Sequence, residues 1–515
     1  MNGAEALLKT IEAAGIDACF ANGGTTEMPL ILAFDSVTGI RPILGLFEGV
    51  CSGAADGYGR MKEKPALCLL HLGPGLANGV ANLHNARRAR TPLLNVIGEH
   101  ASWHVEADAP LAMDIDCLCK TFSGWQRTVR SVETIARDAA EAIEASLRGQ
   151  IASLIVPCDL QWKEYRGDIP AVKSPAFEPP DRRAIESAAK MLASAEKTAI
   201  VMNGRALRRR GLEAAGRIRA AAGCDLFCIN FPAYVDRGAG TVPVSRIPYF
   251  PEPAAAVLAP YRAVVLAGTD QPVNFFGYEG QSSNPIASEV PKLRIDGDAQ
   301  DAAEALEALA DELGAPGMDT LGAIVAGFSI PEVPTGRLTP EKACLTLAAL
   351  QPEGAIIVDE GLTAGMPYFP LGATLAPHSY FMLTGGAIGQ GMPSATGASV
   401  ACPDRPVINL QADGSAMYTV QSLWTQAQAG MNVTTLICSN RSYNIINVEL
   451  QRAGIADASP RVRAFTNLGT PPIDWPSLSR GLGVPGVAVE TCEDLARELK
   501  KALREPGPHL IEMVL

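Results

Sequence analysis

The sequence predicts an α/β protein made of three doubly wound parallel-sheet domains. Short apolar, β-branched runs alternate with helical patterns along most of the chain, as in parallel sheets covered by helices. Two proline-containing stretches, residues 166–181 and 331–339, interrupt this alternation and are typical of linkers. The 515 residues also suit about three domains of ~150 residues each. We therefore expect domains at residues 1–165, 182–330 and 340–515.

The composition narrows the classes of partner. Hydrophobic residues make up 47% of the chain and charged residues 19%, so large cores can form. The net charge of −12 argues against nucleic acid or an anionic membrane surface as the main partner. No apolar run approaches the ~20 residues of a membrane span, and the first helix pattern carries acidic residues, unlike a signal peptide. Twelve scattered cysteines favour a reduced, cytoplasmic protein.

In the first domain, Glu48 is the main candidate for a functional residue. It follows an apolar strand at residues 43–47 and precedes a helix of small residues at 49–60. A carboxylate at a helix amino terminus is stabilised by the helix dipole, which is one sufficient reason for its presence. A catalytic role is the alternative. Downstream, a buried strand at residues 66–72 leads through Gly73-Pro74-Gly75 to a helix at 77–88.

The middle domain gives little functional signal. Strands are expected at residues 198–202 and 263–266, with a helix at 212–222. The turn Asn203-Gly204-Arg205 follows the first strand and is only weakly like a nucleotide-binding turn. We therefore favour a structural Rossmann-like domain here.

The last domain contains the strongest pattern. An apolar strand at residues 407–410 ends at Asp413, a helical pattern runs through Ala429, and a second strand at 433–438 ends before Asn440. Parallel strands joined by a helix bring both turns to one edge of the sheet, where α/β proteins bind ligands. An ordinary βαβ unit with two polar turns is the alternative.

The groups in these two turns suit a metal-bound phosphate. Asp413 offers a carboxylate, Asn440 an amide oxygen and Ser442 a backbone carbonyl, all hard oxygen ligands of the kind Mg²⁺ prefers. The amides of Gly414 and Ser415 open a helix and can hold a phosphate.

Two segments together resemble the thiamine diphosphate (ThDP) enzymes. The run ADGS followed by NRSYN is similar to their GDG(S)…N motif, with Ala412 in place of the first glycine, and LFEGVCSGAADGYGR is similar to their E-x-x-A…ADGYAR segment. The resemblance implies that Asp413, Asn440 and the Ser442 carbonyl bind Mg²⁺, which anchors the cofactor diphosphate. It also implies that Glu48 hydrogen-bonds N1′ of the aminopyrimidine.

The resemblance covers essentially the whole length, in the order pyrimidine-binding, middle and diphosphate-binding domain. In the family, the loop that matches Gly385–Pro393 bends the cofactor, so the Gly386 carbonyl matches the acceptor for the 4′-amino group and Ile388 the wedge between the rings. A glycine-rich turn is the alternative for this loop taken alone. Thr25 lies in NGGTTEMP, which looks like a substrate-facing turn of benzoylformate decarboxylase. The remaining positions implied to meet the cofactor are Gly73, Asn78, Thr363, Gly414, Ser415 and Tyr443.

The implied activity is that of an acetolactate synthase-like enzyme acting on 2-oxo acids. The C2 ylide attacks the oxo group, CO₂ leaves, and the resulting enamine attacks a second carbonyl to give an acyloin. Protonation to an aldehyde, as in benzoylformate decarboxylase, is the alternative. The two active-site histidines of that enzyme fall at Leu69 and near Gly277, and neither is histidine here, which favours carboligation. His71 is the best remaining candidate for an acid, although a core or helix-capping histidine fits equally.

A ThDP-binding paralogue without activity is a third alternative, against which the intact Glu48 and magnesium motif argue. Ile445, Ile446 and Glu449 match substrate-pocket positions of the family. For Glu449, an ordinary charged residue on the surface of a helix is the alternative. In the family, the metal domain and the glutamate domain meet across a subunit interface, so we expect a homodimer or a dimer of dimers. Some relatives bind FAD in the middle domain, but no specific motif supports it here.

Overall fold

The structure is a computed structural model and describes residues 1–320, 322 and 324–515. Its first domain has a parallel six-stranded sheet. The strand order β2-β1-β3-β4-β6-β5 reverses direction beside β1, so the carboxyl ends of β1 and β3 flank the switch point of a doubly wound sheet. One apolar cluster fills each face. The strands are β1 (Ala18–Asn22), β2 (Arg41–Leu44), β3 (Leu67–Leu70), β4 (Leu93–Glu99), β5 (Trp125–Thr128) and β6 (Ile151–Pro157), and the main helices are α1 (Gly3–Ala13), α2 (Met28–Ala33), α3 (Glu48–Lys62), α4 (Leu72–Ala89), α5 (Ile115–Cys119), α6 (Ile135–Ser146) and α7 (Cys158–Trp162).

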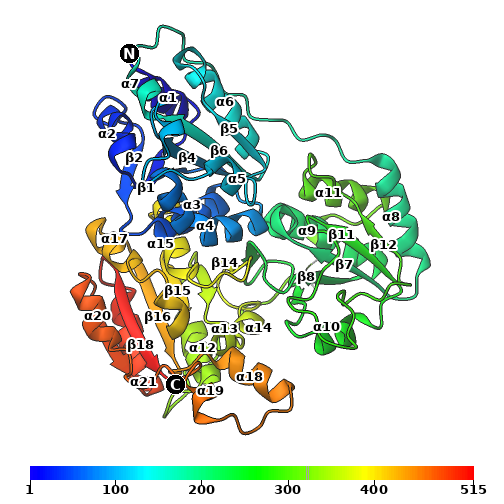
Figure 1. Cartoon of the computed structure of the whole chain (residues 1–515). Helices are drawn as coiled ribbons and strands as arrows, with labels where there is room; N and C mark the ends of the chain where they lie inside the picture. The colour runs from blue at the N-terminus through cyan, green and yellow to red at the C-terminus, as the bar shows by residue number, and fades with distance from the viewer. Residues whose placement is uncertain (321, 323) are drawn as a thin grey trace.

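The second sheet is also parallel, with the order β10-β8-β7-β11-β12. Figure 1 shows this middle domain beside the other two. Its two central strands lie where the sequence places them. The elements are β7 (Thr198–Met202), β8 (Asp225–Cys228), β10 (Ser245–Arg246), β11 (Ala263–Ala267) and β12 (Lys292–Arg294), with α8 (Arg182–Ser194), α9 (Arg209–Ala222), α10 (Pro251–Leu258) and α11 (Ala302–Glu312).

The third sheet has seven strands in the order β17-β18-β16-β15-β13-β14-β9. One strand departs from the expected purely parallel pairing, because β9 (Val235–Arg237) comes from the middle part of the chain and pairs antiparallel with β14. The others are β13 (Ile356–Glu360), β14 (His378–Met382), β15 (Val407–Ala412), β16 (Val433–Ser439), β17 (Gly486–Val489) and β18 (His509–Val514), and the helices include α12 (Pro340–Leu350), α13 (Leu362–Gly365), α14 (Tyr368–Leu371), α15 (Gly391–Ala401), α18 (Asn444–Arg452), α20 (Trp475–Gly481) and α21 (Cys492–Ala502).

Two local expectations were wrong. The helix expected to run through Ala429 is broken into α16 (Asp413–Ala416) and α17 (Ser422–Gln428), and between them the Thr419 hydroxyl donates to the Gly389 carbonyl. The tertiary contact therefore overrides the helical pattern. Gly73-Pro74-Gly75, expected as a loop, forms the first turn of α4, where proline is tolerated because those N–H groups have no helical partner.

Small residues let the first and third domains pack backbone to backbone. A Cβ on Gly57 of α3 would lie 2.1 Å from the Ser394 carbonyl oxygen, and one on Gly397 of α15 would lie 1.8 Å from that of Ala54. The small-residue run after Glu48 is thus explained by this helix contact. Among the described residues, no helix combines the length and apolar character needed to cross a membrane.

Candidate active site

Glu48 begins α3, half-buried, at the carboxyl edge of the first sheet. Asn78 of α4 donates from Nδ2 to Glu48 Oε2 at 2.9 Å, so two predicted site residues are in direct contact. Gly75 lies between them and His71: a Cβ there would come within 3.2 Å of Glu48 Oε1 and 3.3 Å of His71 Cβ. The glycine therefore keeps the space between carboxylate and imidazole open.

His71 is held by a buried carboxylate. Its Nδ1 lies 2.7 Å from Glu27 Oε2, and Glu27 is fully buried. The Thr26 hydroxyl donates to Glu27 Oε1 at 2.6 Å, and the Gly24 N–H donates to Oε2 at 2.7 Å. An ionised Glu27 can only accept, so Nδ1 carries the hydrogen and Nε2 is the nitrogen left for proton transfer.

The second group of residues lies at the carboxyl edge of the third sheet. Asp413 is 3% exposed; its Oδ1 accepts from the Gly414 N–H at 2.8 Å and its Oδ2 from the Arg441 N–H at 2.7 Å. Asn440 Oδ1 accepts from the Ser442 N–H at 2.9 Å. The two turns that follow β15 and β16 are therefore adjacent, as predicted.

The donor set fits a hard cation. Burial raises the pKa of Asp413 to about 6, with a smaller contribution from the charge of Glu512. A buried carboxylate of this kind is stabilised by a bound cation, and the neighbouring Asn440 and Ser442 oxygens are suitable co-ligands for Mg²⁺. Among the described residues, no three or more His, Cys, Asp and Glu side chains are grouped so that they could hold a metal ion together.

The glycine-rich loop predicted to bend the cofactor is held from several sides. Asn85 Nδ2 donates to the Ala387 carbonyl at 2.7 Å, and the Ala387 N–H donates to Asn85 Oδ1 at 3.2 Å. Glu360, buried at the end of β13, accepts from the N–H groups of Gly389 at 2.7 Å and Gly391 at 2.5 Å. Burial raises the pKa of Glu360 to about 7. The loop carrying Gly386 and Ile388 is thus rigidly placed.

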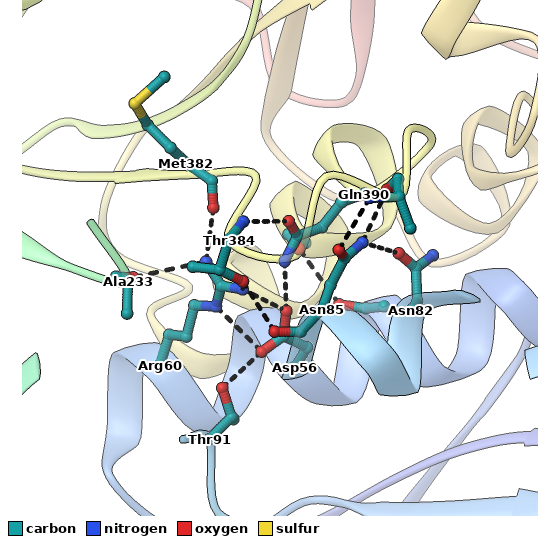
Figure 2. Close-up of polar contacts among 12 residues, drawn as sticks. Asp56, Arg60, Asn82, Asn85, Thr91, Ala233, Met382, Thr384 and Gln390 are labelled. Carbon is teal, nitrogen blue, oxygen red and sulfur yellow. Dashed lines mark hydrogen bonds and ion pairs between the residues drawn. The ribbon is translucent and has the colours of Figure 1, made fainter. Parts of the chain in front are cut away.

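A buried ion pair links this loop to the helix that starts with Glu48. Figure 2 shows Asp56 and Arg60 of α3 beneath the loop. Arg60 Nη2 lies 2.7 Å from Asp56 Oδ2, Arg60 Nη1 donates to the Met382 carbonyl at 2.7 Å, and Gln390 Nε2 donates to Asp56 Oδ2 at 2.5 Å. The ADGYGR run of the sequence therefore has a structural role in positioning the loop.

Backbone strain marks three of the predicted turns. Leu72, Leu362 and Arg441 have φ values of 52°, 49° and 55°, a region that non-glycine residues adopt rarely. They adjoin His71, Thr363 and Asn440 respectively. Such strain persists where surrounding structure enforces it and is frequent at functional sites.

A large cavity of about 1110 Å³ lies between the middle and third domains. It is lined by Thr363, Gly386 and Ile388, all predicted to meet the cofactor, and by Ile445, predicted for the substrate pocket. Aromatic rings of the middle domain form much of the remaining wall, including Phe231, Tyr249, Phe250, Phe275 and Phe276. The volume and apolar lining suit a small-molecule site.

Several residues that the structure places at this site were not predicted from the sequence. Leu69, aligned with a decarboxylase histidine, is buried in the core, whereas His71 two residues later lies in the site. Phe275, not Gly277, reaches the bending loop: a Cβ on Gly386 would lie 2.9 Å from its ring. The capping pattern around Glu27 and the strand-end position of Glu360 were the available signals for those two carboxylates.

The remaining predicted residues lie near these groups with less direct contacts. Thr25 is exposed and its neighbour Thr26 faces His71. Tyr443 packs over Gly414, Ile446 is exposed, and Glu449 accepts from the Tyr278 hydroxyl at 2.8 Å. A Cβ on Gly73 would meet Met113 at 2.2 Å, so this glycine makes room for that side chain. Their roles in binding stay predictions.

We call the residues around Glu48 and His71 the first half-site and those around Asp413 the second half-site. Within the described part of the chain, no hydrogen bond or ion pair joins Glu48 to Asp413. The glycine-rich loop does approach the start of α3, because Asn82 Nδ2 donates to the Gly49 carbonyl at 2.8 Å and to the Gly389 carbonyl at 3.2 Å.

Comparison with known proteins agrees with these features. Residues 1–116 match the family domain described as "Thiamine pyrophosphate enzyme, N-terminal TPP binding domain", and residues 368–513 match the corresponding C-terminal TPP binding domain. A Mycobacterium tuberculosis protein with the provisional name acetolactate synthase large subunit IlvX is 47% identical, covering 100% of this chain and 99% of that protein. Benzoylformate decarboxylase of Pseudomonas aeruginosa is 26% identical, covering 97% and 96%.

Among solved structures, the thiamine diphosphate-dependent 4-hydroxybenzoylformate decarboxylase of Rhodococcus jostii RHA1 superposes with a TM-score of 0.87 at 23% identity. The superposition covers 100% of this chain and 99% of that one, and it supports the three-domain fold.

Proposed function

Because the chain belongs to the thiamine pyrophosphate enzyme family, we propose that it is a ThDP- and Mg²⁺-dependent decarboxylase of 2-oxo acids that releases an aldehyde. The observation that carries this proposal is the His71–Glu27 pair beside Glu48. The preference for carboligation rested on the lack of histidine at Leu69 and near Gly277, and the His71–Glu27 pair supports protonation instead.

The cofactor would be held by groups from both half-sites. Asp413, Asn440 and the Ser442 carbonyl would hold Mg²⁺ and through it the diphosphate, with the amides of Gly414 and Ser415 as further donors. When bound, ThDP supplies a carbon nucleophile and holds the electron pair left when CO₂ departs. Glu48 would polarise the aminopyrimidine by hydrogen bonding, and Asn78 fixes the orientation of the Glu48 carboxylate.

His71 would deliver the proton that ends the cycle. Glu27 fixes the ring through Nδ1, so Nε2 can exchange a proton with the substrate carbon without reorientation of the imidazole. Apolar and aromatic side chains line much of the cavity beside Ile388, and a bound substrate would displace water from them, which would limit competing proton transfers.

Acyloin formation is the second candidate. The cavity is large enough for a second carbonyl compound, and the 47% identical relative is named as an acetolactate synthase large subunit. Phe275 rather than an acid touches the bending loop, so the middle domain adds no proton donor at that point. A paralogue without activity is disfavoured, because Glu48 and the Asp413 and Asn440 motif are intact in the sequence.

The resemblance to ThDP enzymes, in which the metal domain and the glutamate domain meet across a subunit interface, supports two copies sharing each active site. Glu48 of one copy would face Asp413 of another in a dimer or a dimer of dimers.

Incubating purified protein with ThDP, Mg²⁺ and a panel of 2-oxo acids tests the proposal. Aldehyde as the main product supports it, whereas acyloin as the main product favours the second candidate. No turnover of any 2-oxo acid by ThDP-loaded protein would overturn both.

A further inference from the structure

Three arginines, Arg219, Arg237 and Arg246, and one carboxylate, Asp225, line the large cavity, and Arg237 and Arg246 make no ion pair among the described residues. Arg237 of β9 is 5% exposed, and its Nη1 is buried with no hydrogen-bond partner. Arg246 of β10 donates to the Tyr380 hydroxyl at 3.4 Å and to Met382 Sδ at 3.1 Å. Both guanidinium groups stack on the ring of Phe369, at 3.6 and 4.7 Å from its centroid.

The nearest carboxylate cannot neutralise both. Asp359 is buried and accepts from the Tyr380 hydroxyl at 2.7 Å; it attracts Arg246 electrostatically, but its hydrogen-bonded link to Arg246 runs through that hydroxyl and the two form no ion pair. No ion pair to either arginine exists within the described part of the chain. His378, which pairs with Arg237 across the strands, has its pKa lowered to about 4 by burial and adds no charge at neutral pH.

A buried cation without a partner is costly, and buried charges in proteins are ordinarily paired. Arginine in particular presents a planar fork that matches carboxylate and phosphate groups. The unpaired Nη1, the burial of Arg237 and the position of both arginines on the wall of a cavity together indicate an anionic ligand.

The reacting carboxylate of a 2-oxo acid is a poor occupant. It leaves as CO₂, so strong binding to arginine would stabilise the ground state and slow the reaction. Binding of a distant, unreactive part of the substrate, in contrast, can position it without that penalty.

Building on the proposed function, we propose that Arg237 and Arg246 form an anion-binding site for a second carboxylate or phosphate group of a 2-oxo acid substrate. The apolar body of this substrate would lie along Phe231, Tyr249 and Phe275, with its oxo-acid end toward Ile388.

Direct binding tests the site without catalysis. Phenyl phosphate, benzoate and neutral benzamide are titrated calorimetrically into ThDP–Mg²⁺ enzyme. At least one of the two anions should bind, and Arg246→Met should weaken it by at least about tenfold while leaving benzamide unchanged. The preferred anion distinguishes phosphate from carboxylate. Equal affinity of all three probes for wild type and variant would overturn the proposal.

Paired substrates test the assignment to the substrate. The ratio of kcat/KM for 2-oxoglutarate to that for 2-oxopentanoate, in which a methyl group replaces the terminal carboxylate, should fall by at least about tenfold in Arg246→Met. Arg262→Gln, at an exposed arginine outside the cavity, is the control and should leave the ratio unchanged. An equal loss for both substrates would show a merely structural role and contradict the site. Failure of the proposed function would show instead as no turnover of either acid with anion binding intact.

Arg237→Met gives a second readout. Removing an unpaired buried charge should raise the melting temperature of ligand-free protein and reduce the stabilisation by the anionic probe. A lower melting temperature would contradict the unpaired state. ThDP affinity should be unchanged in both variants. Its loss, or loss of a co-purified flavin seen by absorbance, would assign the arginines to a cofactor phosphate and overturn the substrate assignment.

Discussion

Replacing Glu27 by glutamine should slow aldehyde release and raise the acyloin fraction. Glu27 accepts from three groups, the His71 ring, the Thr26 hydroxyl and the Gly24 amide, and the glutamine NH₂ cannot accept. Loss of a buried charge-assisted hydrogen bond costs about 1.5–3 kcal/mol, or roughly a tenfold to hundredfold lower rate of the protonation step. His71→Gln removes the proton donor itself, and its effect should reach the ~10²–10⁴-fold typical of general acid catalysis.

The assay quantifies aldehyde and acyloin from the same reaction, with ThDP affinity measured alongside. Glu106→Gln, at an exposed acidic residue in the same domain, is the matched control and should change neither product. Should both products fall in parallel, or the product ratio stay at the wild-type value in His71→Gln, the pair would serve packing rather than proton transfer. The His71 variant keeps the test valid if loss of the buried Glu27 charge prevents folding.

Three further results are expected. Glu48→Gln should lower turnover about a hundredfold or more with ThDP still bound by calorimetry, and an unchanged rate would remove Glu48 from the mechanism. Because burial raises the pKa of Asp413 from 3.8 to about 6, the favourable contribution of its protonated form in metal-free protein is complete below pH 3.8 and is lost as pH rises through 6, about 3 kcal/mol in all. Urea unfolding between pH 4 and 7 should show a shallower slope in Asp413→Asn than in wild type, since the raised pKa of Glu360 contributes to the slope of both; equal slopes would refute it. Asn85→Ala leaves Ala387 without two partners and should cost about 1–3 kcal/mol of stability by denaturant unfolding and lower turnover; wild-type values for both would mean that the loop is held without Asn85.

The sequence was most informative where a site depends on one strand and the turn after it. Asp413 and Asn440 follow adjacent parallel strands, so their proximity could be predicted from the strand–helix–strand pattern alone. Glu48 could be placed at the end of a strand for the same reason.

Features that depend on distant segments were not predictable in this way. The Glu27–His71 contact arises because β1 and β3 are neighbours in the sheet, although 44 residues separate the pair. Glu360 looked like an ordinary turn residue because its partners, Gly389 and Gly391, come about thirty residues later. β9 joins the third sheet from the middle part of the chain and brings Arg237 with it, which no local pattern could indicate.

The account depends most on the sharing of each active site between two copies. Glu48→Gln and Asp413→Asn are each expected to be inactive, because each removes one half-site. Co-expressed with different tags, they should form mixed dimers in which one of the two sites has both residues intact, so the mixture should recover about a quarter of wild-type activity. An inactive mixture, with mixed dimers confirmed by co-purification of the two tags, would contradict a shared site.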